Sequence, residues 1–215
     1  MKRIVVGAGA QGRVVLEMWR AQHPHDEFLF LDDSATLHGS AILGAPVAGP
    51  VSSIGTFEGA AEAVVAIGNN RIRLAVADRF GIQLGIVIHP SAVISPSSVI
   101  GAGTVVFAGA IVGTQAKVGA NVILNTGVII EHDATVEDGA SFSPGTKTGG
   151  RIHVGRGAFL ATGVTLAPRV RVGAWSVVGA GSVVVRDIAS QTLAHGVPAR
   201  PVRAIDDSFD WQTLL

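Results

Sequence analysis

Three consecutive residues whose side chains can move protons, Glu131, His132 and Asp133, stand near the middle of the chain. A neutral imidazole accepts a proton at physiological pH, and a neighbouring carboxylate can orient the ring and stabilise its protonated form. His132 is therefore the candidate general base, with one of its two acidic neighbours as the orienting group. The alternative is a polar corner residue without a chemical role.

A metal centre is the other chemistry that histidines suggest. His153 follows His132 by 21 residues, and no third histidine lies between Ala92 and Asp187. Zinc sites on a repeating fold need several histidines that the repeat brings to one edge. We therefore expect His153 to face solvent and expect no metal site.

The glycine-rich segment Gly7–Gly12 follows a short apolar run, residues 3–6, and precedes a predicted helix that ends near Gln22. A second predicted strand, residues 28–31, ends in two aspartates. In such a βαβ unit a phosphate can approach the helix N-terminus and an acidic residue can bind a ribose hydroxyl. Only one such half is present, so a nucleoside diphosphate fits better than NAD. A structural domain without a ligand is the alternative.

After a predicted strand at 63–67, a helix that ends near Phe80 and a strand at 85–88, a six-residue repeat runs without insertion from Ala92 to Asp187. Each hexad predicts one short strand and a corner, and three hexads close one coil of a parallel β-helix. A β-sandwich would not keep a fixed step of six over sixteen units. The third places form an apolar column that only Thr148 breaks: Ile94, Ile100, Val106, Val112, Val118, Leu124, Ile130, Val136, Phe142, Thr148, Val154, Leu160, Leu166, Val172, Val178 and Val184.

The composition indicates a globular chain with a large core, because 48% of the 215 residues are hydrophobic and 15% are charged. The net charge is zero and no basic run could follow phosphates, which argues against nucleic acid as a partner. The absence of cysteine suits a reducing cytoplasm. The uncharged stretch 92–116 is interrupted by Ser, Pro and Gly, and the first apolar run is too short for a signal peptide, so we expect no membrane insertion.

The order of GAGAQG, FLFLDD, AIGNN with RIR, IHPSAVISP, ILNTGVIIEHD and HGVPARPV resembles the sialic-acid and bacillosamine-pathway acetyltransferases, a hexapeptide-repeat family. The resemblance implies a Rossmann-like nucleotide-sugar-binding domain over 1–90, a left-handed β-helix over 91–187 and a closing segment over 188–215. It also implies direct acetyl transfer from acetyl-CoA to the amino group of a UDP-, dTDP- or GDP-linked amino sugar, for polysaccharide biosynthesis in the cytoplasm. We expect a homotrimer, because outward apolar positions and a site at a subunit groove both require partners.

The resemblance assigns catalysis to His132 and Asp133. The family's second histidine, nine residues after the base, is Ser141 here, so either that hydroxyl or the Gly150 amide is the expected second donor. Other expected contacts are Thr162 and Ala180 with acetyl-CoA, and Arg200 or Arg203 with its phosphates. The expected nucleotide-sugar contacts are Gly9, Ala10, Gln11, Asp32, Asp33 and Gly68.

Three other functions remain open at this point. An O-acetyltransferase of the sialic-acid branch would share the fold, the acetyl donor and the base. A nucleotide-binding oxidoreductase would bind NAD and not CoA, and a non-catalytic scaffold would not need His132.

Overall fold

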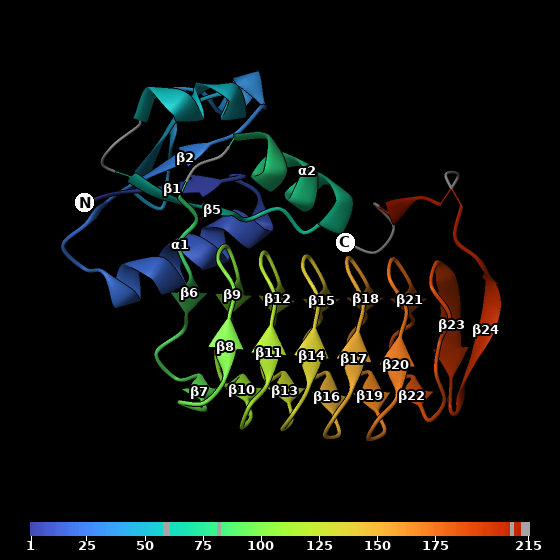
Figure 1. Cartoon of the computed structure of the whole chain (residues 1–215). Coiled ribbons are helices and arrows are strands. Elements are labelled where there is room, and N and C mark those ends of the chain that lie inside the picture. Colours follow the sequence, from blue (N-terminus) through green and yellow to red (C-terminus); the bar gives the residue numbers. More distant parts are fainter. Residues whose placement is uncertain (58–60, 81–82, 207–208, 212–215) are drawn as a thin grey trace.

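The computed structural model describes residues 1–57, 61–80, 83–206 and 209–211, and it contains an α/β domain that lies along one side of a long β-helix (Figure 1). The α/β domain is built on a five-stranded sheet in the order β3-β4-β2-β1-β5, in which only β3 runs antiparallel to its neighbour. Its elements are β1 (Lys2–Val6), α1 (Ala10–Gln22), β2 (Glu27–Leu31), a 3-10 turn (Ala35–Leu37), β3 (Ala41–Ile42), β4 (Ala45–Gly49), a second 3-10 segment (Val51–Phe57), β5 (Ala61–Val65) and α2 (Asn70–Phe80).

The apolar run of β1 is buried on both faces, as expected for the centre of a parallel sheet. Helix α1 packs on this sheet through Val15, Leu16 and Trp19, whose spacing places them on one helical face. Gly12 permits the close approach, because a Cβ at this position would overlap the carbonyl oxygen of Gly7. Gly12 thus has a packing role, and the ligand role expected of this segment stays a prediction.

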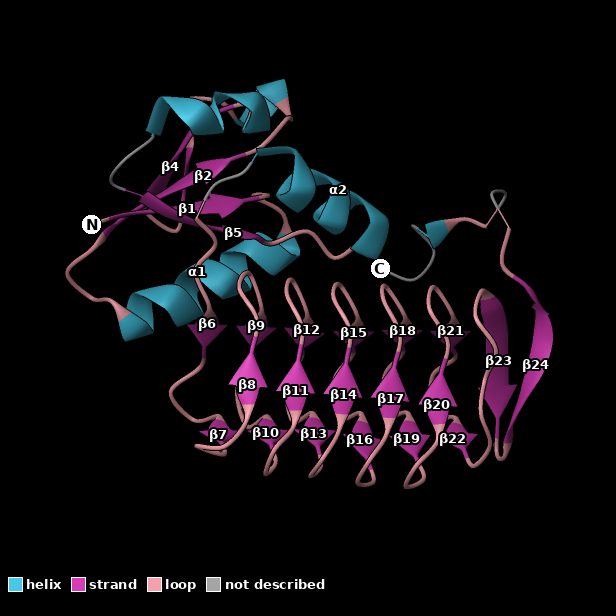
Figure 2. Cartoon of the chain, viewed as in Figure 1, coloured by secondary structure: helices cyan, strands magenta, loops and turns pink. Residues whose placement is uncertain are grey.

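The hexads form a left-handed parallel β-helix with one two-residue strand in each unit (Figure 2). Strands 18 residues apart pair in register, so that each coil rests on the next. The strands are β7 (Val93–Ile94), β8 (Val99–Ile100), β9 (Val105–Val106), β10 (Ile111–Val112), β11 (Lys117–Val118), β12 (Ile123–Leu124), β13 (Ile129–Ile130), β14 (Thr135–Val136), β15 (Ser141–Phe142), β16 (Lys147–Thr148), β17 (His153–Val154), β18 (Phe159–Leu160), β19 (Thr165–Leu166), β20 (Arg171–Val172), β21 (Val177–Val178) and β22 (Val183–Val184).

Three sheets form the sides of the β-helix. The β7 sheet contains β7, β10, β13, β16, β19 and β22, and the β8 sheet contains β8, β11, β14, β17 and β20. The domain-facing sheet contains β6 (Val87–Ile88), β9, β12, β15, β18 and β21, and it ends in a hairpin of β23 (Thr192–Gly196) and β24 (Ala199–Ala204). Of the strand expected at 85–88, Val87 and Ile88 pair with β9 in the β-helix, while the N–H of Gly85 donates to the carbonyl of Ala63 in β5 at 2.9 Å.

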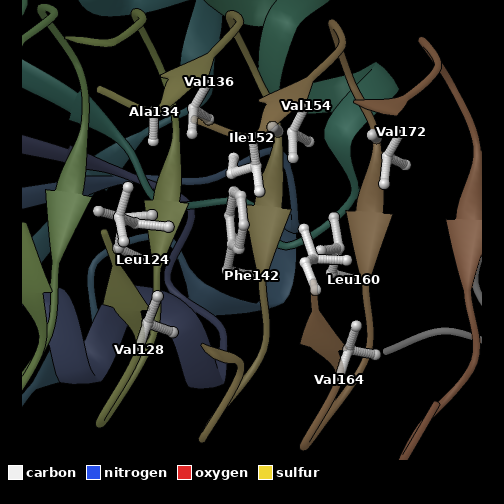
Figure 3. Close-up of a cluster of buried hydrophobic side chains, with 14 of the residues drawn as sticks. Leu124, Val128, Ala134, Val136, Phe142, Ile152, Val154, Leu160, Val164 and Val172 are labelled. Atoms are coloured by element: carbon white, nitrogen blue, oxygen red, sulfur yellow. The ribbon is translucent and has the colours of Figure 1, made fainter. Parts of the chain in front are cut away.

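The third-place residues point inward and form the core of the β-helix, where Leu124, Phe142 and Leu160 are fully buried in consecutive coils (Figure 3). Glycines with φ of 64–74° turn the chain at many corners, where a side chain on an L-residue would be strained. The predicted fold and its inward column are confirmed.

The two domains meet around Arg73, on the first turns of α2. This side chain is 1% exposed, and burial lowers its pKa to about 9, so it remains protonated at neutral pH. Its nitrogens donate at 2.8–3.1 Å to six uncharged acceptors: the carbonyl oxygens of Ile67, Gly68, Asn121 and Gly139, Oδ1 of Asn70 and Oγ of Ser141.

Other residues of α2 also lie in close contact with the β-helix. Asn70 donates to the carbonyl oxygens of Gly157 and Ala158 at 3.1 and 3.2 Å. Gly139 contacts α2 directly, since a Cβ there would lie 2.6 Å from Cγ of Leu74. The Arg71 guanidinium lies 5.0 and 5.3 Å from the rings of Trp175 and Trp211, so the C-terminal segment also binds α2.

We predict that Arg73→Met strongly destabilises the protein, because several buried acceptors lose their donor at once. At about 1–3 kcal/mol for each buried group left unpaired, the total loss is roughly 3 kcal/mol or more. Urea unfolding followed by tryptophan fluorescence measures it. The control is Lys2→Met, an exposed cation of the same domain, which should change stability by less than about 0.5 kcal/mol. Equal stability of the two variants would contradict the prediction.

Candidate active site

His132 lies at a corner of the β-helix, directly after β13 and before β14. Coils on both sides hold this corner: the N–H of Asp133 donates to the carbonyl of Thr114 at 2.9 Å, and the N–H of Arg151 donates to the carbonyl of His132 at 2.9 Å. The imidazole itself is about half exposed, at 51%. The backbone is therefore fixed while the ring remains open to a substrate.

Asp133 contacts the imidazole directly, with 2.8 Å between its Oδ2 and Nδ1 of His132. This hydrogen bond is the main cause that lowers the pKa of the Asp133 carboxyl; the charges of His132 and Arg151 act in the same direction, against some desolvation. An ionised carboxylate only accepts hydrogen bonds, so Nδ1 carries the proton and Nε2 keeps its lone pair. Nε2 is thus the atom that can act as a base.

Glu131, the other acidic neighbour, does not contact the ring in this way. Its carboxylate is 3.4 Å from the backbone nitrogen of His132, and its own N–H donates to Oγ1 of Thr148 at 3.0 Å. Arg151 lies near Asp133, with 3.6 Å between its Nε and Oδ2. Of the two carboxylates that the sequence offered, the geometry places Asp133 against the imidazole.

Gly150 lies one coil beyond His132 and against its ring. A Cβ on Gly150 would stand 2.6 Å from Cε1 of His132 and closer still to Nε2, so a side chain at this position would displace the imidazole. Within the described residues, the Gly150 N–H has no hydrogen-bond acceptor. A free N–H beside the basic nitrogen suits an oxyanion that forms there.

The other expected acetyl-CoA contacts do not lie at this corner in a single chain. Ser141 is on the domain-facing sheet, 4% exposed, and its hydroxyl donates to Oδ1 of Asn70 at 2.7 Å. Thr162 and Ala180 are exposed one above the other at the corner between the domain-facing sheet and the β7 sheet. The contact of Ser141, Thr162 and Ala180 with acetyl-CoA therefore stays a prediction. In this structure the Ser141 hydroxyl already donates a hydrogen bond to Asn70, so it is not free to donate to acetyl-CoA.

The expected nucleotide-sugar residues gather at the carboxyl ends of β1, β2 and β5. Asp32 accepts hydrogen bonds from the N–H groups of Ala8 and Ser34, both at 2.8 Å, and Asp33 accepts one from Val51 at 2.9 Å. Helix α1 begins at Ala10 after the N-cap residue Gly9, without a side-chain cap.

Gln11, in the first turn of α1, and Gly68, in the loop after β5, differ in whether their polar groups are free to bind a ligand. The Nε2 of Gln11 is buried and has no hydrogen-bond partner within the described structure. Gly68, by contrast, is tied to Arg73 through its carbonyl oxygen. The uncapped helix N-terminus and the unpaired amide suit an anionic ligand with polar acceptors.

The remaining cationic and histidine side chains lie elsewhere. His153 bonds to Glu137 at 2.7 Å in a surface groove of about 530 Å³, and it is 28% exposed. Arg200 is exposed on β24, and Arg203 stacks 5.1 Å from the ring of Phe209. In the part of the chain that the structure describes, no group of three or more metal-ligating side chains is present.

Sequence reasoning missed Asn70 and Arg73, although both belong to the AIGNN and RIR motifs that it noted. Their spacing of three on a predicted helix could have shown that they share a face. The β-helix residues that they bind lie 48 to 88 positions away, which no local pattern reveals. Among the described residues no helix is long and apolar enough to span a bilayer.

Comparisons with known proteins match the sequence of the α/β domain and the fold of the whole chain. Residues 2–80 match the family model of the PglD N-terminal domain. The acetyltransferase domain of PglB from Neisseria gonorrhoeae FA1090 superposes with a TM-score of 0.89 at 34% identity, covering 94% of this chain and 99% of its own, and a second structure of it holds acetyl coenzyme A.

Two more solved structures cover 94% of this chain. PerB from Caulobacter crescentus, in complex with CoA and GDP-perosamine, has a TM-score of 0.86, 34% identity and 98% coverage of its own chain. WeeI from Acinetobacter baumannii AYE has a TM-score of 0.85, 26% identity and 100% coverage of its own chain. Among curated protein sequences there was no match.

We predict that Gly150→Ala lowers turnover of the His132-dependent reaction without unfolding the protein. Gly150 has no left-handed backbone, so alanine fits locally, and only the half-exposed ring must move. A displacement near 1 Å costs up to roughly 10²-fold in rate. Thermal unfolding should change little.

The control for this prediction is the same change in a His132→Asn background, where Gly150→Ala should add almost nothing because the displaced ring is gone. Independent, multiplicative losses from the two substitutions would contradict it.

Proposed function

We propose that this chain, which belongs to the hexapeptide-repeat sugar acetyltransferases, acetylates the amino group of a nucleotide-linked amino-deoxy sugar. This is the family of the PglB acetyltransferase domain and of perosamine N-acetyltransferase, and the chain is an acetyl-CoA-dependent acyltransferase. The observation that carries the proposal is the exposed His132–Asp133 pair, in a chain that matches enzymes solved with CoA and GDP-perosamine over nearly its whole length. We place the reaction in the cytoplasm and in polysaccharide biosynthesis.

The proposed reaction is a direct transfer between two bound substrates. The sugar amine attacks the thioester carbonyl carbon, and Nε2 of His132 takes the proton that the nitrogen must lose. The oxyanion of the tetrahedral intermediate accepts a hydrogen bond from the Gly150 N–H. When the C–S bond breaks, the imidazolium returns its proton to the departing thiolate, so the products are the amide and CoA.

Asp133 acts on the imidazole in two ways. Its hydrogen bond fixes the Nδ1–H tautomer, and its negative charge stabilises the imidazolium that forms when Nε2 takes the proton. Since the pKa of its carboxyl is lowered, Asp133 remains ionised throughout the pH range in which histidines ordinarily titrate.

The α/β domain is the proposed site for the nucleotide. The N-terminus of α1, with Gly9, Ala10 and the unpaired amide of Gln11, faces the diphosphate, and Asp32, Asp33 and Gly68 line the same edge of the sheet. A diphosphate carries the negative charge that a helix N-terminus attracts.

We propose that the site is completed between copies of the chain in a homotrimer. The His132 corner and the corner of Thr162 and Ala180 lie at opposite edges of the β7 sheet, so one chain does not bring them together. Val93, Ile111 and Ile129 stand in register on the outer face of this sheet, and the first two are 61% and 39% exposed. Contact between copies would cover this apolar stripe and bring the His132 corner of one copy next to the Thr162 and Ala180 corner of another.

The activity is tested by release of CoA thiol with acetyl-CoA and a panel of UDP-, dTDP- and GDP-linked amino sugars. We expect activity with at least one amino sugar and none with its hydroxyl analogue. His132→Asn should lower kcat/KM by roughly 10²–10⁴-fold, the usual contribution of a general base. The protein should stay folded, since the ring is half exposed.

The pH profile should show an acidic limb, because a protonated imidazole cannot accept the substrate proton. Asp133→Asn is a clean partner variant, since asparagine also tolerates the φ of 56° found at this position. It should lower activity less than His132→Asn, because the ring remains. If Glu131→Gln abolished activity while His132→Asn did not, Glu131 would be the base.

The homotrimer is tested by light scattering at micromolar concentration, where we expect a mass near three chains of 21.9 kDa. Ile111→Glu places a charge in the apolar stripe and should weaken the assembly. A monomeric wild-type chain that retained full activity would overturn the proposal that copies complete the site.

A further inference from the structure

Thr148 is the one polar residue in the inward column of the β-helix. It is 6% exposed and stands one coil beyond Ile130, directly below Leu166 in the stacked order. A buried hydroxyl among apolar side chains costs free energy unless it is hydrogen-bonded. Thr148 therefore differs from its apolar neighbours in the column, because its hydroxyl needs a hydrogen-bond partner. It stands opposite Ile130, which is two residues before His132.

The hydrogen bonding of Thr148 departs from the regular ladder of the β7 sheet. In the neighbouring rungs the residue after each strand donates its N–H to a backbone carbonyl one coil later, as Gly113 does to Ile130 and Gly149 does to Leu166, both at 2.8 Å. At the His132 coil, the N–H of Glu131 instead donates to the Thr148 side chain at 3.0 Å. The pairing of β13 with β16 correspondingly keeps one register pair, Ile129 with Lys147.

This bond holds the peptide that leads into His132. The next two hydrogen bonds at this corner, from the N–H of Asp133 to the carbonyl of Thr114 and from the N–H of Arg151 to the carbonyl of His132, follow the pattern of the other coils. The bond to the Thr148 hydroxyl is the one that departs from that pattern. Thr148 has the same backbone carbonyl as Ile130 and Leu166 at this place in the neighbouring coils, so a valine at 148 would still offer the ladder an acceptor. The hydroxyl thus holds the Ile130–Glu131 peptide, one residue before the residue that carries the imidazole.

We propose that Thr148 is a positioning residue for the acetyl-transfer reaction: its hydroxyl sets the Glu131–His132 backbone so that the imidazole lies against Gly150 with Nε2 directed to the substrate. This inference rests on the proposed role of His132. Thr148 acts through the backbone and touches neither substrate.

Two near-isosteric variants separate positioning from stability. Thr148→Val removes the hydroxyl and restores an apolar column, so the protein should be as stable as the wild type or more stable, while kcat falls roughly 10- to 10²-fold with both KM values nearly unchanged. Thr148→Ser keeps the hydroxyl and loses a buried methyl, so its melting temperature should fall while kcat stays within about twofold of the wild type. In a His132→Asn background, Thr148→Val should have almost no further effect.

A second readout does not depend on the substrate. The imidazole ¹⁵N resonances of His132 should shift in Thr148→Val and not in Thr148→Ser, whether or not an acceptor sugar is known. Unchanged resonances and wild-type kcat in Thr148→Val would overturn the inference. Shifted resonances in a protein that acetylates no amino sugar of the panel would instead overturn the proposed function while leaving the positioning role intact.

Discussion

The backbone ladder between successive coils is the interaction on which the rest of this structure depends. A strand of two residues cannot satisfy its own polar groups, so its N–H groups must find carbonyls in another coil. In the β7 sheet the N–H after each strand bonds to a carbonyl 17 residues later at every rung but that of Glu131. The ladder fixes the corners as firmly as the strands. Side chains at a corner therefore project from a rigid frame, which a catalytic group needs and a surface loop rarely provides.

The same frame explains how the α/β domain is placed. Helix α2 docks on corners of the coils where the ladder leaves the carbonyl oxygens of Asn121, Gly139 and Gly157 without a backbone donor among the described residues. A guanidinium is suited to this role, because its fixed fork of five N–H groups reaches several carbonyls at once. Arg73 thereby joins Gly68, in the loop proposed to hold the nucleotide, to Gly139 on the β-helix. One buried side chain thus bonds to both the proposed nucleotide loop and the β-helix.

The fold was predictable because its period is visible in the chain. A six-residue step sustained from Ala92 to Asp187 leaves one architecture, and the first βαβ unit was predicted within a residue or two of β1, α1 and β2. The short apolar run at 85–88 was not assigned to its sheet, because two-residue strands of valine and isoleucine fit either sheet. The location of Ser141 against Asn70 was not predictable, since it depends on how two domains dock.

The choice between Glu131 and Asp133 shows why the site needed the structure. Consecutive residues of a strand point to opposite faces, so a histidine in a strand cannot contact its neighbour in sequence. The chain leaves the strand at this corner, and the left-handed conformation of Asp133, with φ of 56°, turns its carboxylate back to the ring. Glu131 comes before this turn, and its N–H is bonded to Oγ1 of Thr148. Gln115, Arg151 and Arg169 occupy the same left-handed place in other coils, so the corner recurs, and only at Asp133 does it join a carboxylate to an imidazole.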